Sequence, residues 1–352
     1  MALPIHPPLQ PMLAKLSREL PRNGFLYEPK WDGFRCIAFV DGDDVDLRSR
    51  NDKPLARYFP ELVAGLAAAA SEAVVLDGEI VGAGDHDFDA LMLRLHPAVS
   101  RVERLARESP AVFVAFDLLA VGDADVRGRP FAERRERLAE MLGHAGPPVH
   151  LTPATEDPRV AARWLERFVG GGIDGVVAKP RDAGYQPGVR AMVKVKQEQT
   201  ADCVVAGFRS FVDGPPVGSL LLGLYDAGGQ LQHVGVAASF AARRQPELAA
   251  ALFPRVSPLA GHPWEHGFLL GGGAGGRLAG AAGRWSPDEM DLDWFPVSPM
   301  PVCEVAYDQV DRGRFRHAAR FRRWRPDRDP ASCRLDQIEI EAPPPAEVLS
   351  LT

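Results

Sequence analysis

The sequence predicts an α+β chain of two domains, with a mixed helix and sheet domain over residues 1–198 and a small β-barrel domain over residues 199–352. In the first part, apolar strand-like runs alternate with helix-like segments. After Lys196 the pattern changes to short β-like runs separated by turn residues, which favours a small barrel. The length of 352 residues, of which 46% are hydrophobic and 25% charged, is enough for two buried cores.

The first domain begins with strand-like segments. Residues 25–48 hold two apolar runs on either side of an acidic turn, which predicts an antiparallel pair. Residues 73–81 are expected to form two short strands that turn at Asp77, and the continuous apolar run at 111–116 suits a buried central strand. We interpret Asp77, and likewise Asp117, as acidic residues of turns.

Three helices are predicted between these strands. Two are expected at 60–70 and 130–142. The third follows Asp157, because Asp157 and Pro158 are typical of an N-cap and a first helical position, and apolar residues repeat at helical spacing from Val160 onward.

The second domain is predicted to be built from short strands. We expect them at 203–208, 218–225, 231–236 and 302–307. The link at 197–200 is expected to be a hinge. The glycine-rich segment 261–283 matches no phosphate-loop spacing, so we interpret it as a flexible barrel loop and assign it no chemistry.

One lysine stands in a setting typical of a nucleophile for nucleotidyl transfer. Residues 27–35 read Tyr-Glu-Pro-Lys-Trp-Asp-Gly-Phe-Arg, with Lys30 near the centre. A lysine attacks a phosphate only as the neutral amine, so its pKa must be lowered by neighbouring positive charge and by removal from water, and Arg35 is one candidate neighbour. Gly33 would allow a tight turn that points Lys30 and Arg35 into one pocket. Taken alone, the same residues also fit the end of a surface strand with a salt bridge.

Further motif-like segments follow Lys30 along the chain. They are Ser49–Asn51, Leu76–Val81, Phe116–Leu119, Asp174–Lys179, Lys194–Lys196 and Arg320–Arg328. With the segment around Lys30 they resemble, in order and approximate spacing, the motifs of the covalent nucleotidyltransferases and specifically of ATP-dependent DNA ligases, over about residues 10–340. The length and the residues before Lys30 are most similar to the small bacterial LigC type. The resemblance implies a nucleotidyltransferase (ATP-grasp-like) adenylation domain followed by an OB-fold domain.

The resemblance also assigns the chemistry. Lys30 would attack the α-phosphate of ATP, forming lysyl-AMP and releasing pyrophosphate. Lys194 and Lys196 are two residues apart, so on a strand they share a face and can contact that phosphate, and they would help to keep Lys30 neutral. Glu79 and Asp174 would bind Mg²⁺ or Mn²⁺, for which carboxylate oxygens are suitable ligands. The family more often has glutamate at position 174, and the shorter aspartate favours a metal contact through water.

A second group of residues would hold the nucleotide. Phe116 matches the residue that stacks on adenine in relatives, although a core phenylalanine is the alternative interpretation. Glu28 resembles the residue beside the adenine ring, Arg50 the one near the ribose, and Val177 part of the apolar wall against the base. Arg35 is assigned to the same pocket.

The charge distribution bears on DNA binding. The formal net charge is −6, yet residues 311–329 contain eight arginines against three aspartates. This basic run is expected to contact DNA phosphates, with a solvated face as the alternative, and intrinsic DNA affinity is predicted to be weak. Within it, Arg325 and Asp327 would orient the leaving pyrophosphate. Arg328 replaces the usual lysine, which keeps the charge but changes its geometry.

Cofactor and location are predicted from what the sequence lacks. The four cysteines show no CxxC spacing, unlike the zinc module of NAD-dependent ligases, so ATP is the expected cofactor. No run is long and apolar enough for a membrane span, so we expect a cytoplasmic protein that works at the nucleoid. About 29 residues precede Lys30, too few for the extra N-terminal DNA-binding domain of larger ligases.

These observations predict an ATP-dependent DNA ligase that seals 5′-phosphate/3′-hydroxyl nicks in duplex DNA during repair. We expect a monomer, a large domain motion between steps, and recruitment by repair proteins such as an end-binding protein or a polymerase. An RNA ligase or a capping-type nucleotidyltransferase shares the lysine motif and is the alternative. A non-catalytic DNA-binding scaffold is the alternative of another class.

Overall fold

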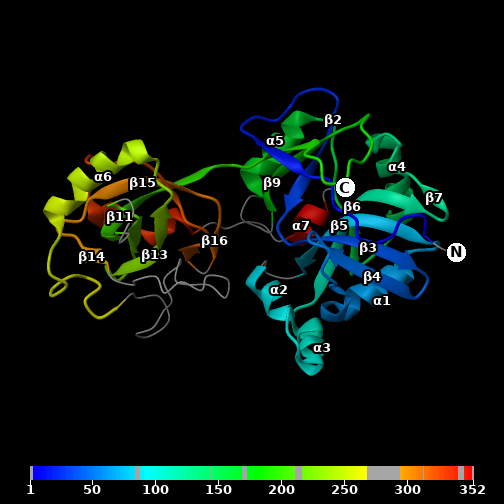
Figure 1. The fold of residues 1–352 in the computed structure, drawn as a ribbon, viewed down its shortest axis with the longest axis horizontal. Helices are drawn as coiled ribbons and strands as arrows, with labels where there is room; N and C mark the ends of the chain where they lie inside the picture. The colour runs from blue at the N-terminus through cyan, green and yellow to red at the C-terminus, as the bar shows by residue number, and fades with distance from the viewer. Residues whose placement is uncertain are drawn as a thin grey trace. The chain divides into compact units, whose positions relative to one another are not determined.

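The computed structural model describes residues 3–83, 88–143, 145–168, 173–210, 216–267, 294–311, 313–339 and 345–350. Most of the glycine-rich segment, from residue 268 onward, lies outside the described residues. The chain forms two compact units (Figure 1), Met1–Gln197 together with Glu341–Thr352, and Glu198–Ile340. The predicted α+β class is observed in the mixed first unit, and the second unit is dominated by strands.

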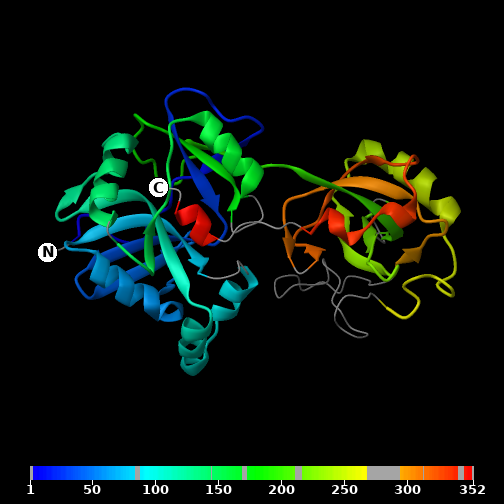
Figure 2. The same cartoon turned by 180° about the vertical axis from the view of Figure 1, so that it is seen from behind.

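The C-terminal residues group with the first unit, whereas the sequence had assigned them to the second. They include helix α7 (Pro345–Leu349), drawn in red within the first unit in Figure 2. Val348 is fully buried in an apolar cluster with Trp164 and Phe168. Burial of Val348 gives this segment its place in the first unit.

One sheet of the first unit carries most of the motif residues. Its strand order is β1 (Ala14–Ser17), β10 (Met192–Val195), β9 (Ile173–Pro180) and β2 (Phe25–Trp31). Strand β1 runs parallel to β10, and the other pairs are antiparallel. Strands from both ends of the unit's sequence therefore lie side by side.

The second sheet of this unit contains the buried centre of the fold. Its strand order is β4 (Asp44–Ser49), β3 (Phe34–Asp41), β5 (Val74–Gly82), β6 (Ala111–Val121) and β7 (Ala124–Asp125), with β8 (Val149–Leu151) also pairing with β6. The predicted antiparallel pair is confirmed as the hairpin β3–β4, and every residue of β6 is buried, as predicted for a central strand.

The predicted turn at Asp77 is wrong, because β5 runs through it without a break. Gly78 is required by close packing and does not mark a turn. A Cβ atom at Gly78 would lie 2.4 Å from the Phe113 ring, and a real side chain would clash there.

Helical segments cover these sheets. They are η1 (Ala56–Tyr58), α1 (Pro60–Ala69), α2 (Phe88–Arg94), α3 (Val99–Glu108), α4 (Phe131–Leu142) and α5 (Pro158–Arg167). The three predicted helices are observed as α1, α4 and α5, whereas the other segments were not predicted. The predicted N-cap of α5 is confirmed, since the Asp157 carboxylate accepts a hydrogen bond from the Arg159 N–H at 2.8 Å. No helix among the described residues is long and apolar enough to cross a membrane.

The second unit is a curved sheet with short helices. Its strand order is β13 (Leu231–Ala238), β12 (Ser219–Tyr225), β11 (Gln199–Arg209), β15 (Val302–Tyr307) and β18 (Arg320–Trp324), and β14 (Phe295–Pro296) also pairs with β11. The smaller elements are η2 (Ala242–Arg244), α6 (Gln245–Leu252), η3 (Phe253–Arg255), β16 (Val310–Asp311), β17 (Arg314–Phe315), η4 (Pro330–Ser332) and η5 (Leu335–Gln337).

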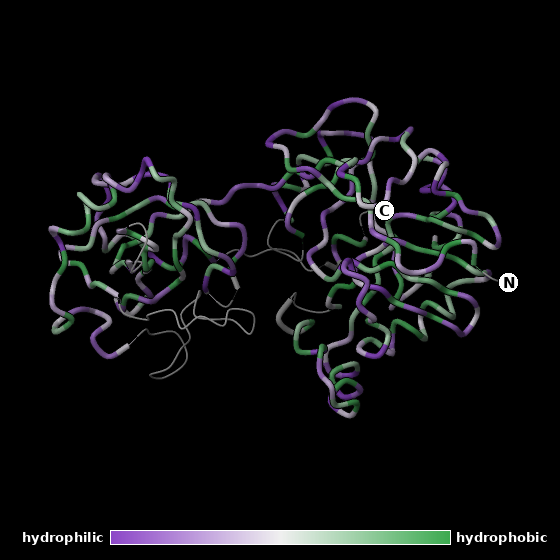
Figure 3. Tube along the Cα trace, in the orientation of Figure 1, coloured by the Kyte–Doolittle hydropathy of each residue, from purple (hydrophilic) through white to green (hydrophobic). Residues whose placement is uncertain are grey.

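This sheet bends toward a barrel. Ala237 of β13 bridges to Ala319, just before β18, so its two outer strands approach each other. Figure 3 shows apolar stretches along the strands of both units, and the largest buried apolar cluster belongs to the second unit. The four strands predicted here are all observed.

Candidate active site

Lys30 lies at an irregular point of β2. The register of β2 on β9 shifts between Pro29 and Trp31, opposite the start of β9. The Lys30 Nζ lies 2.6 Å from one carboxylate oxygen of Asp174, and the Lys196 Nζ lies 2.7 Å from the other. Two motif lysines thus share a single carboxylate that is only 7% exposed.

This contact adds a requirement that the sequence did not reveal. A carboxylate 2.6 Å away stabilises the lysine ammonium, whereas attack on a phosphate needs the neutral amine. Attack by Lys30 on a phosphate would therefore require that its amine first lose Asp174 as a partner. Arg35, the predicted positively charged neighbour of Lys30, is paired with Asp77 at 2.6 Å.

Two glycines bring the motif strands close together. A Cβ atom at Gly33 would lie 2.0 Å from the Ile80 carbonyl oxygen, so β3 could not start this close to β5 with any other residue. The expectation that Gly33 supplies unusual dihedrals is wrong, because it is not among the glycines with positive φ. Gly175 has φ +152°, and a Cβ there would lie 2.2 Å from the Val195 carbonyl oxygen.

Three strands align polar groups around Val177. In the sheet register Val177 pairs with Glu28 on one side and with Lys194 on the other. The pKa of Lys194 is lowered, first by burial and then by the charges of Lys30 and Lys196. Three lysines thus gather where an anion would be stabilised.

Glu79 supplies a second carboxylate near Lys30. It lies on β5 in register with Arg35 of β3. Its pKa is raised to about 7, mainly by removal from water, while Arg35 and Lys30 act in the opposite direction. Among the residues that the structure describes, no group of three or more His, Cys, Asp or Glu residues could hold a metal. Two carboxylates suit Mg²⁺, which keeps several waters and binds through one or two carboxylates together with substrate phosphates.

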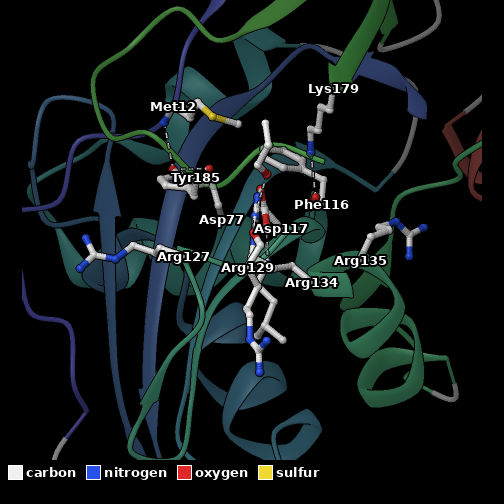
Figure 4. A network of polar contacts seen from close by, with 12 residues as sticks. Met12, Asp77, Phe116, Asp117, Arg127, Arg129, Arg134, Arg135, Lys179 and Tyr185 are labelled. Atoms are coloured by element: carbon white, nitrogen blue, oxygen red, sulfur yellow. Dashed lines mark hydrogen bonds and ion pairs between the residues drawn. The ribbon is translucent and has the colours of Figure 1, made fainter. Parts of the chain in front are cut away.

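Arg35 belongs to a closed ring of hydrogen bonds, part of which is drawn in Figure 4. Its Nε and Nη2 each donate to Asp77 at 2.6 Å. The Tyr185 hydroxyl donates to Asp77 at 2.6 Å and accepts from the Met12 N–H at 2.9 Å. Arg35 Nη2 then reaches the Met12 carbonyl at 3.3 Å. The ring joins strands β3 and β5 to residues that flank β1 and β10, and so connects the two sheets.

Asp77 is therefore a buried strand residue and not a turn residue. Replacing its side chain tests how much the ring of hydrogen bonds contributes to stability. We expect Asp77→Ala to lower the free energy of unfolding by about 3 kcal/mol, because the charge of Arg35 loses its partner. Asp125→Ala is the matched control. Its carboxylate also pairs with an arginine, Arg127, but is 39% exposed, so the loss should stay below about 1 kcal/mol. Equal losses in chemical denaturation of both variants would contradict the ring's role.

The ring of Phe116 is in contact with two cations, one from each sheet. Its ring is 7% exposed, with Arg35 Cζ 4.4 Å and Lys179 Nζ 4.5 Å from the ring centroid. Lys179 also donates to the Phe116 carbonyl at 2.8 Å, a contact drawn in Figure 4. The orientation of the ring is therefore held from β3 and β9.

Lys179 also holds Glu28. The two side chains, each 3% exposed, are 2.7 Å apart, and Arg135 Nε lies 3.6 Å from the same carboxylate. Burial raises the pKa of Glu28 against the pull of both cations. Sequence reasoning quoted Lys179 within a motif but gave it no role, and missed Arg135 and Tyr185, because only folding brings these residues to the site.

Asp117 also contradicts its interpretation as a turn residue. It lies inside β6 and is 1% exposed. Arg134 of α4 donates to its two carboxylate oxygens at 2.8 and 3.0 Å. Asp117 anchors α4 to the sheet beside Phe116.

Arg50 lies at the exposed turn after β4. Its positive charge lowers the pKa of Lys194, but less than burial and the neighbouring lysines do.

The basic run of the second unit is largely paired with carboxylates. The pairs are Arg320 with Glu198 and Asp308, Arg322 with Glu198, Arg323 with Glu304, Arg325 with Asp202 and Asp327, and Arg328 with Asp202. Arg325 donates to both oxygens of Asp202 at 2.9 Å. Acidic residues of the same unit therefore balance much of the positive charge of this run, and its contact with DNA phosphates stays a prediction.

Comparisons with known proteins identify the family of the chain. A family model described as ATP dependent DNA ligase domain matches residues 11–196, and one described as ATP dependent DNA ligase C terminal region matches residues 213–328. The chain is 50% identical over 345 residues to "DNA ligase C2" of Mycolicibacterium smegmatis and 49% identical over 346 residues to "DNA ligase C" of Mycobacterium tuberculosis, with 96% of each chain covered in both cases.

More distant matches extend this picture. A protein of Mycobacterium bovis named "Multifunctional non-homologous end joining protein LigD" is 32% identical over 330 residues, which cover 92% of this chain and 39% of that protein. A solved structure from work on Lig E DNA ligases has a TM-score of 0.53 at 18% identity, covering 90% of this chain and 99% of the other. At that identity the likeness concerns the fold alone.

Proposed function

Since the chain belongs to the family of ATP-dependent DNA ligases, we propose that it seals nicks through an AMP group carried on Lys30. Family membership confirms the predicted resemblance to the LigC type, the ligase activity, and the adenylation and OB-fold architecture. It also favours the ligase over the alternatives, which were an RNA ligase or capping-type nucleotidyltransferase and a non-catalytic DNA-binding scaffold. The proposal concerns which residues perform each step.

The observation that carries the proposal is the cluster around Lys30. Lys194 and Lys196 lie beside it, and Asp174 contacts Lys30 and Lys196 directly. Lys30 attacks the α-phosphorus of ATP, a bond forms between Nζ and phosphorus, and pyrophosphate leaves. The other two lysines stabilise the negative charge on the phosphate oxygens.

Glu79 and Asp174 are the residues that would hold Mg²⁺ or Mn²⁺. A bound divalent ion supplies charge neutralisation for the phosphates. Asp174 would then have a cation other than Lys30 to balance its charge, which favours the neutral amine that attack requires. The donor set fits because both carboxylates lie close to Lys30.

The nucleotide pocket is proposed to follow the same strands. Adenine would lie between Phe116 and Val177, with Glu28 beside its edge. Arg35 and Arg50 would contact the sugar side of the nucleotide. The ring that fixes Arg35 and the contacts of Lys179 support this arrangement, because both orient groups around the pocket without a ligand.

Nicked duplex DNA is the proposed acceptor. Its 5′-phosphate takes AMP from Lys30, and the 3′-hydroxyl then attacks the adenylylated phosphate, forming the backbone bond and releasing AMP. Arg325 orients the pyrophosphate during the first step, which requires the second unit to move before DNA enters. The relative named for end joining supports a role in repair. Recruitment by an end-binding protein or polymerase, a monomeric state and a cytoplasmic location complete the proposal.

The free energy of unfolding of a Glu79 variant at two pH values tests whether this carboxylate is a buried group that does not support the fold. Its pKa of about 7 means that its buried charge destabilises the folded state as the pH rises from about 4.5 through 7. We expect Glu79→Gln to raise the free energy of unfolding by about 2 kcal/mol at pH 8 and to have little effect at pH 5. Thermal unfolding at both pH values measures this. A variant that is less stable than the wild type at pH 8 would show that the carboxylate supports the fold.

A further inference from the structure

Three arginines are buried among the residues that the structure describes, and one of them differs from the other two. Arg94 pairs with Glu61 at 2.8 Å, and Arg134 pairs with Asp117. Arg209, at the end of β11, is 9% exposed, and its Nε and Nη2 are buried with no hydrogen-bond partner. A buried charge without a partner costs several kcal/mol, so a fold that keeps one needs another reason for it.

The surroundings of Arg209 are positive. His233 of β13 is fully buried, and its pKa is lowered to about 3, first by burial and then by the charges of Arg314 and Arg209. The positive charges of both arginines therefore act on His233. Arg314 is on β17, which packs against β13. Over the described part of the chain, no carboxylate pairs with Arg209 or Arg314.

An anion would complete this cluster. A guanidinium with unused N–H groups, already removed from most of its water, binds a phosphate through two parallel hydrogen bonds and desolvates little further on binding. Three carboxylates of the unit, Asp202, Glu198 and Glu304, are engaged by the basic run. With a net charge of −6, DNA binding depends on cations that keep their charge available.

We propose that Arg209, assisted by Arg314, forms a phosphate-binding site in the second unit that receives a backbone phosphate of the nicked duplex. The assignment to DNA rests on the proposed acceptor, and the roles given to Lys30 and its neighbours do not enter it. ATP and pyrophosphate carry the same chemistry and are the other sources to be distinguished.

The test replaces Arg209 with methionine, which has a similar shape and no charge. Binding to a nicked duplex is measured without ATP or divalent metal, from about 50 to 200 mM salt. We expect Arg209→Met to bind about 10-fold more weakly and to reduce the slope of log affinity against log salt by about 1. Its melting temperature should equal or exceed that of the wild type, because an unpaired buried charge is removed.

Arg255→Met is the matched control. Arg255 is also in the second unit and is partly buried, but it donates to the Ala251 carbonyl at the end of α6, so this variant should keep the wild-type salt slope. Unchanged affinity and slope in Arg209→Met, or a clear loss of stability, would overturn the site. A raised KM for ATP in AMP loading, with DNA affinity unchanged, would overturn the assignment to DNA. AMP loading at wild-type rate separates these outcomes from a failure of the role of Lys30.

Discussion

Replacing Lys30 with alanine is expected to abolish transfer of AMP to the protein and, with it, ATP-dependent sealing of nicked DNA. No other lysine combines an irregular strand end with contact to Asp174 and proximity to Lys194 and Lys196 among the described residues. The last step, attack of the 3′-hydroxyl on adenylylated DNA, forms no bond to Lys30. Lys30→Ala should therefore still seal a nick that is already adenylylated.

The measurement compares radiolabel transfer from ATP with sealing of a pre-adenylylated nick. Lys15→Ala, which changes an exposed lysine of β1 at the opposite edge of the same sheet, is the control and should match the wild type in both assays. If Lys30→Ala still accepts the label, or if it loses both reactions equally, Lys30 is not the carrier of AMP.

Replacing Arg325 with alanine is expected to slow AMP loading by about 100-fold, because one cation that stabilises the departing pyrophosphate is lost. The structural cost should be small. Asp202, the partner of Arg325, keeps a contact with Arg328 at 3.1 Å. Sealing of pre-adenylylated DNA involves no pyrophosphate and should stay near the wild-type rate.

Arg323→Ala is the matched control, because Arg323 lies near the end of β18, two residues before Arg325, and is paired with Glu304 at the surface. It should retain both activities. Single-turnover rates of AMP loading and of sealing, measured for both variants, test whether Arg325 acts only in AMP loading. Equal losses in both steps for Arg325→Ala would assign this arginine to the fold or to DNA binding.

Local patterns predicted most elements of the fold. The β3–β4 hairpin, the buried strand β6 and the start of α5 depend on signals only a few residues long. The interpretation failed at Asp77, where an Asp-Gly pair between apolar runs resembles a turn. The strand continues there because its carboxylate meets Arg35, 42 residues earlier, and Tyr185, 108 residues later.

The site was predicted only in part, because contacts between residues far apart in the sequence leave no local pattern. The motifs marked Lys30 and the carboxylates, whereas the pairing of Lys179 with Glu28 joins residues on two strands and has no local signal. The basic run showed its charge in the sequence, but the acidic partners come from β11 and β15. The unpaired state of Arg209 depends on which carboxylates are already engaged, and only the structure shows that.

The most direct test of the central claim is intact mass measurement of the purified protein after incubation with divalent metal and ATP, GTP or NAD in separate reactions. Protein that was isolated already adenylylated is first stripped with pyrophosphate. We predict one added AMP with ATP alone, mapped by peptide sequencing to Lys30. An adduct on another residue, GMP in place of AMP, AMP from NAD alone, or no adduct with any donor would contradict the account.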